Sequence, residues 1–161
     1  MQFDKIFDIT QEGYLELWPP FAGALFVLLA FGGFLARRWL GPRWLRFMPL
    51  VVMIIGILWT LVATAITVIP YLELSAALRN GRCTLTEGVV TQFEPEPASG
   101  HGFESFVVDG KYFRYSVYEW SPGFHRTHLN GSPLREGVHV KIYHVGNDIA
   151  RLEVARSDIT R

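Results

Sequence analysis

The chain has little cysteine, no excess of charge of either sign and none of the common catalytic motifs. Its 161 residues include one cysteine, Cys83, which excludes an intrachain disulfide and therefore a small domain held together by disulfides. The 15 basic and 15 acidic side chains balance. There is no H-E-x-x-H sequence, Walker loop or G-x-G-x-x-G turn, so the sequence gives no sign of the commonest zinc, nucleotide or dinucleotide sites.

Charge is missing altogether from two long apolar runs, residues 17–36 and residues 47–72. A helix rises about 1.5 Å per residue, so 20 residues cover about 30 Å, the thickness of a hydrocarbon core. We therefore predict two transmembrane helices. Because neither run contains Asp, Glu, Lys, Arg or His, no residue marks a path for protons or ions through the membrane.

Aromatic residues mark the ends of both runs. Trp18 opens the first run, Trp39 and Trp44 flank the connection, and Tyr71 closes the second run. Trp and Tyr gather where a bilayer meets water, so we predict that these four residues lie at the membrane interface. Small residues within the runs would allow close helix packing: Gly23, Gly32, Gly33 and Gly56.

The connection between the two runs is basic. It carries four arginines and no acid: Arg37, Arg38, Arg43 and Arg46. The segment before the first run is acidic, with Lys5 as its only base. Basic loops stay in the cytoplasm, so we predict a bacterial inner-membrane protein with both termini on the non-cytoplasmic side. Arg79 and Arg82, after the second run, offset part of this bias.

We predict four segments along the chain. Residues 1–16 form an acidic segment that lies on the membrane as a short amphipathic helix, because its apolar residues share one helical face; a frayed terminus is the alternative. Residues 17–80 form a two-helix transmembrane hairpin with a stalk that ends at Asn80-Gly81. Residues 83–156 form a small β domain, and residues 157–161 are a tail.

Alternating apolar residues and hairpin turns indicate the β domain. Two alternating runs meet at Asp109-Gly110, a typical type I′ turn, and two more meet at Gly146-Asn147. With the alternating run over residues 83–93 this makes five strands. We predict a small all-β, OB- or SH3-like, partly open barrel, since closure removes exposed sheet edges.

Three stretches of the β domain resemble a known family. They read "ESFVVDGKYFRYS", "PGFHRTHLNGSPLREGVHVKI" and "GNDIARLEV", and together they are similar to a pattern in uncharacterised bacterial two-span membrane proteins with a C-terminal small β-barrel. The resemblance covers residues 87–154. It implies a membrane hairpin followed by a β domain, and it brings no activity and no catalytic residues.

The loop "EWSPGFHRTHLNG", residues 119–131, combines aromatic and cationic side chains between two hairpins. Protein interfaces favour such residues, and we predict a binding surface made by Trp120, Phe124, His125, Arg126 and His128. A metal site would need a third ligand, such as His101, Glu104 or Glu119, and nothing in the spacing requires one. As a structural alternative, Trp120 or Phe124 caps the open end of the barrel.

These features predict a non-catalytic accessory subunit. Its β domain would dock on a larger membrane complex or on a periplasmic protein, without a cofactor or a metal. From Cys83 onward the chain has ten acidic and eight basic residues, so it lacks the basic surface of a nucleic-acid-binding domain. A small-ligand or metal-sensing module and an immunity-type membrane protein are the alternatives.

Overall fold

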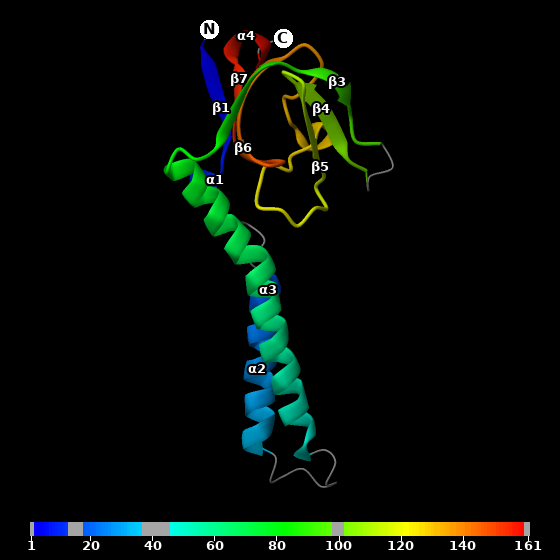
Figure 1. Cartoon of the computed structure of the whole chain (residues 1–161). Coiled ribbons are helices and arrows are strands. Elements are labelled where there is room, and N and C mark those ends of the chain that lie inside the picture. The colour runs from blue at the N-terminus through cyan, green and yellow to red at the C-terminus, as the bar shows by residue number, and fades with distance from the viewer. Residues whose placement is uncertain (1, 13–17, 37–45, 98–101, 160–161) are drawn as a thin grey trace. The chain divides into compact units, whose positions relative to one another are not determined.

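The structure is a computed structural model that describes residues 2–12, 18–36, 46–97 and 102–159. The chain divides into two units. Residues 15–70 form a helical unit, and residues 1–14 together with residues 71–161 form a β unit. Figure 1 shows the helices and strands of both.

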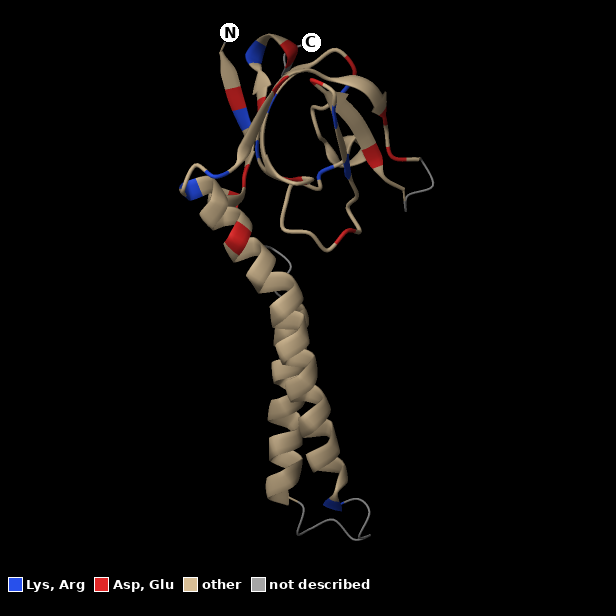
Figure 2. Ribbon diagram, in the orientation of Figure 1, with Lys and Arg blue, Asp and Glu red and all other residues tan. Residues whose placement is uncertain are grey.

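The helical unit contains α2 (Trp18–Ala36) and the first part of α3 (Met48–Arg79). Both helices are long and apolar enough to cross a membrane, as the sequence predicts. In Figure 2 their ribbons are almost free of charged residues, whereas acidic and basic residues are interspersed over the β unit. Helix α3 runs unbroken through Pro70 into the β unit.

Two glycines let α2 and α3 pack closely, side by side (Figure 1). A Cβ added to Gly23 would collide with the side chain of Thr60, and one added to Gly56 would lie 3.1 Å from a methyl group of Val27. The predicted close packing therefore holds at these positions. Gly32 is different, since a Cβ there would meet nothing within 4 Å.

The described residues include only part of the predicted membrane interface. Trp18 is exposed, Tyr71 is half-buried, and Arg46 lies two residues before α3. The other predicted residues of the connection lie outside the described residues: Arg37, Arg38, Trp39, Arg43 and Trp44.

The prediction of a helix near the N-terminus is wrong for residues 3–8. Phe3–Asp8 is a strand, β1, which pairs antiparallel with β7 (Asp148–Ala155), and only Ile9–Glu12 form a short helix, α1. The pairing has a register shift between Lys5 and Phe7. This register shift explains the error. In an irregular strand the apolar residues do not alternate strictly, and their spacing can then also fit one face of a helix.

The β unit has seven strands among the described residues, two more than predicted. They form two antiparallel sheets, ordered β1-β7-β6-β2 and β3-β4-β5. Both predicted hairpins are present, and positive φ angles at Asp109 (48°) and Gly110 (74°) fit the type I′ turn. The remaining elements are β2 (Thr84–Val89), β3 (Thr91–Glu94), β4 (Glu104–Val108), β5 (Lys111–Tyr115), η3 (His128–Asn130), β6 (His139–Val145) and α4 (Arg156–Ile159).

The predicted single strand over residues 83–93 is divided at Val90. Val90 is fully buried; its N–H donates to the carbonyl of Val138 at 2.8 Å, and its own carbonyl accepts from Gly137 at 2.9 Å. The chain therefore leaves one sheet here and enters the other. In the part of the chain that is described, the strand pairings do not join the two sheets into a closed barrel.

Two apolar clusters hold the β unit together. The larger one fills the space between the sheets, with Phe106 and Phe113 stacked at 5.4 Å and both fully buried. The smaller one joins α1, the end of α3 and β7 through Ile9, Leu74 and Ala150. The last turns of α3 and the N-terminal segment are thus part of the β unit.

Candidate functional site

The predicted binding loop is fastened to the β unit by Phe124. Phe124 is 3% exposed, its ring packs at 5.4 Å from Tyr115 and 5.5 Å from Phe7, and its N–H donates to the carbonyl of Ile149 at 3.0 Å. Its side chain therefore belongs to the core and presents no face to a partner. The sequence left two roles open for Phe124, contact with a partner or a structural role in the β domain. Its burial fits the structural role.

A buried polar network fixes the C-terminal end of the loop, residues 127–130, to the β unit. Glu104, which is fully buried, accepts a hydrogen bond from the hydroxyl of Tyr115 and another, 2.7 Å long, from the backbone N–H of His128. The hydroxyl of Thr127 donates to Glu96 at 2.8 Å and accepts from the amide of Asn130 at 2.9 Å. Buried polar groups need such partners, so this network specifies where residues 127–130 lie.

Burial changes the acidity of two members of this network. It raises the pKa of the Glu104 carboxyl, while the hydrogen bonds from Tyr115 and from the N–H of His128 act in the opposite direction. It also raises the pKa of the Tyr115 hydroxyl, to which the Glu104 charge adds. Tyr115 therefore keeps its proton at neutral pH and remains a donor.

The sequence analysis treated Glu104 only as a spare metal ligand and did not single out Tyr115. The signal was present in "ESF", before the turn of the first hairpin, and "YS", after it, because hairpin register places Glu104 directly opposite Tyr115. A carboxylate and a phenol facing one another on the buried side of a hairpin form a natural hydrogen-bonded pair.

Three of the five predicted binding residues are exposed. Trp120 is 51% exposed. The guanidinium of Arg126 lies 3.5 Å from the carboxylate of Glu12, and its side chain is 45% exposed. The ring of His128 stands edge-on to Phe93, at 6.4 Å between ring centroids.

His125 is the fifth predicted residue, and it is less exposed than Trp120, Arg126 and His128. It is half-buried and lines a small polar recess together with Glu119, Ser121 and Asp148. Within the recess, the hydroxyl of Ser121 donates a short hydrogen bond to the carboxylate of Asp148. The five predicted residues therefore comprise three exposed residues, a core residue and a recess residue.

The described residues bring no three His, Cys, Asp or Glu side chains together in a way that could hold a metal ion. Glu104, one proposed third ligand, is occupied by Tyr115 and His128, and His101, another, lies outside the described residues. The hydroxyl of Ser105 donates to the carboxylate of Glu94 at 3.4 Å.

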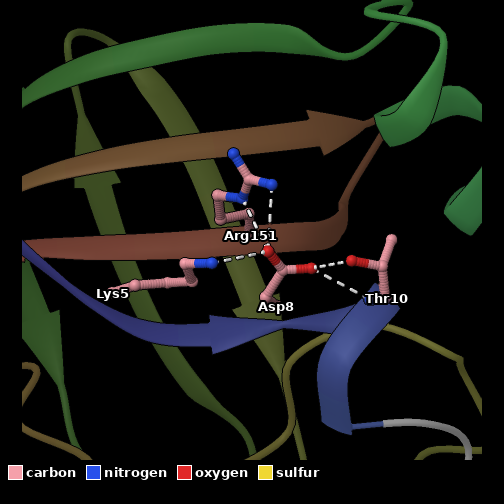
Figure 3. Close-up of polar contacts among 4 residues, drawn as sticks. All are labelled: Lys5, Asp8, Thr10 and Arg151. Carbon is pink, nitrogen blue, oxygen red and sulfur yellow. Dashed lines mark hydrogen bonds and ion pairs between the residues drawn. The ribbon is translucent and has the colours of Figure 1, made fainter.

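A second polar cluster, absent from the sequence analysis, fixes β1 (Figure 3). Asp8 is 2% exposed, and its carboxylate lies 2.9 Å from a guanidinium nitrogen of Arg151 and 3.2 Å from the ammonium of Lys5. It also accepts from the N–H and the hydroxyl of Thr10, at 2.9 and 2.6 Å. Burial opposes its ionisation, but these contacts together lower the pKa of Asp8. The cluster therefore links β1 to β7 through the ion pair between Asp8 and Arg151.

Comparison with protein-family models, with curated proteins and with solved structures found no match for this chain.

Proposed function

We propose that this chain is a membrane-anchored, non-catalytic accessory subunit whose β unit docks on a larger membrane complex or on a periplasmic protein. The observation that supports it is the construction of the loop. Trp120, Arg126 and His128 are exposed, while the segment that carries them is fastened at Phe124 and Thr127. Exposed Trp and Arg on a fixed loop are typical of the energetic centre of a protein interface.

We call Trp120, Arg126 and His128 the docking surface. Its position on a fixed loop lowers the entropy that binding would cost, because the loop is already ordered. Phe124 and His125, which the sequence also suggested, would contribute by holding the loop rather than by touching a partner.

The proposed placement is the bacterial inner membrane, with both termini on the non-cytoplasmic side. The pairing of β1 with β7 supports the hairpin topology, because β1 precedes α2 and β7 follows α3. Strands that share one sheet must lie on one side of a membrane, and two crossings return the chain to its starting side. The arginines of the connection favour the cytoplasm for the turn of that hairpin.

We further propose that the β unit is related to the partly open OB- or SH3-like barrels, and that the chain belongs with the two-span proteins it resembles. The continuity of β2 and β3 across Val90, which takes one strand through both sheets, supports the first proposal. The second is supported by the sequence pattern alone.

The experiment is gentle detergent extraction of the tagged full-length chain, followed by mass spectrometry of the proteins that accompany it. The test variant is Trp120→Ala/Arg126→Ala/His128→Ala. The control variant is Tyr112→Ala/Arg82→Ala, which removes an exposed aromatic and an exposed base elsewhere on the β unit. We expect a stoichiometric partner with the wild type and the control and none with the test variant. Isolation of the chain alone in all three cases would refute the proposal.

A further inference from the structure

A second exposed surface of the β unit lies where β4 begins and β5 ends. Phe103 is 45% exposed, Tyr118 is 59% exposed and Val117 is 37% exposed. Phe103 and Tyr118, with Ser116 and Glu119, line one shallow, mostly apolar hollow. We call Phe103, Val117 and Tyr118 the aromatic rim. Trp120 does not line this hollow and stays with the docking surface.

Charges of both signs flank the aromatic rim. The guanidinium of Arg114 stacks over the ring of Phe103, 3.9 Å from its centre, and Glu119 is one of the residues that line the hollow. The site thus offers aromatic rings and one acidic residue around the hollow, and one cation beside it, over the ring of Phe103. A ligand that carries a phosphate and an ammonium group matches this set, since guanidinium binds phosphate and aromatic rings with a carboxylate bind ammonium.

The covalent connections of the β unit limit its distance from a bilayer. Helix α3 has 32 residues and is about 48 Å long, so about 18 Å of it extends beyond a hydrocarbon core of about 30 Å. On the other connection five residues separate α1 from α2, and they can span about 20 Å at most. Phospholipid headgroups are therefore within reach of the unit, at high local concentration.

We propose that the aromatic rim binds the headgroup of a zwitterionic phospholipid in the bilayer that holds the chain. The phosphate contacts Arg114, the ammonium group contacts Glu119 and the ring of Tyr118, and Phe103 and Val117 lie among the headgroups. Trp and Tyr side chains favour this layer because it is wet at one edge and apolar at the other. The inference rests on the membrane placement proposed above, and it concerns different residues from the docking surface.

The test uses the full chain in nanodiscs of phosphatidylcholine that contain a fraction of lipid with a nitroxide on its headgroup. A fluorophore is attached at Val117→Cys in a Cys83→Ala background, and a reference fluorophore at Glu136→Cys, an exposed position on another loop. We expect at least threefold stronger quenching at residue 117 than at residue 136. Equal quenching at the two positions would overturn the inference.

Two variants test which side chains make the contact. Phe103→Ser/Tyr118→Ser should reduce quenching at residue 117 to the reference level, whereas Tyr112→Ser/Leu129→Ser, a matched change of exposed apolar residues, should leave it as in the wild type. Unchanged hydrogen exchange in β4 and β5 verifies that the variants are folded. Quenching that survives the first pair of changes would show that the aromatic rim does not make the contact.

Lipid composition tests the headgroup. In nanodiscs of phosphatidylglycerol, which lacks the ammonium group, quenching at residue 117 should fall at least twofold, and equal quenching would refute the zwitterionic assignment. Failure of the chain to enter nanodiscs would overturn both the membrane placement and this inference. Entry without quenching would overturn this inference alone, and protection of the label only in a native complex would assign the aromatic rim to a protein.

Discussion

Replacement of Asp8 by alanine should release β1 from the sheet. The carboxylate of Asp8 is the common acceptor for Arg151, Lys5 and Thr10, and it is almost fully buried. Removal of one partner from a buried ion pair costs about 3–5 kcal/mol when the other charge stays buried. Here the side chains of Arg151 and Lys5 are 29% and 38% exposed and can recover contact with water, so we expect a smaller cost, about 2–3 kcal/mol.

Hydrogen exchange of the full chain in detergent measures this cost at the strand itself. The backbone N–H groups of β1 that bond to β7 report on the opening of that pair. A cost of 2–3 kcal/mol corresponds to exchange about 30- to 150-fold faster in β1, since 1.4 kcal/mol is a factor of ten. Asp8→Asn, which keeps an acceptor for Thr10 but loses the charge, should give an intermediate value.

The control is Asp4→Ala in the same strand. Asp4 pairs with Arg156, but their side chains are 36% and 55% exposed, against 2% for Asp8, and exposed pairs contribute little. We therefore expect nearly unchanged exchange in β1. Wild-type exchange in Asp8→Ala, or equal acceleration in Asp4→Ala, would refute the argument that burial gives Asp8 its importance.

Two further predictions concern the buried acid and the helix pair. Because burial raises the folded-state pKa of Glu104 above its ordinary value of 4.5, its contribution to stability is greatest below that value and declines as the pH rises through the raised pKa. Glu104→Gln should therefore melt with less pH dependence than the wild type as the pH rises above 4.5; identical slopes in thermal scans would contradict this. Gly56→Leu should separate α2 from α3 and cost about 1–3 kcal/mol, whereas Gly32→Leu, where the added Cβ meets nothing within 4 Å, should have no effect on unfolding in detergent.

The elements that the sequence predicts well are those whose pattern is local. The two apolar runs lack charge over their whole length, and the Asp109-Gly110 turn joins two alternating runs, so each can be recognised without its neighbours. Periodicity and turn chemistry suffice in these cases. The sequence likewise placed the loop of residues 119–131 between the two hairpins.

The features that the sequence analysis missed depend on distant partners. Phe3–Asp8 is too short and too irregular to be assigned by itself, and it becomes a strand because β7 offers an open edge about 145 residues later. Phe124 could not be told from an exposed aromatic, since its burial depends on Phe7 and Tyr115. Composition indicates which residue types favour an interface, but long-range packing decides which of them remain exposed.

The position of β1 also constrains how the β unit is completed. The first strand of the β unit, β1, comes before both apolar helices in the sequence. The partner of β1 is β7, the last strand among the described residues. The contact between them closes the longest loop in the molecule, which is entropically costly and slow to form. The buried cluster at Asp8 and the apolar contact of Ile9 with Leu74 and Ala150 offset that cost at the point where the chain returns. Because Leu74 lies in the last turns of α3, the same contacts that hold β1 also join the end of that helix to the sheet, so the β unit is complete only when the end of α3 is in place.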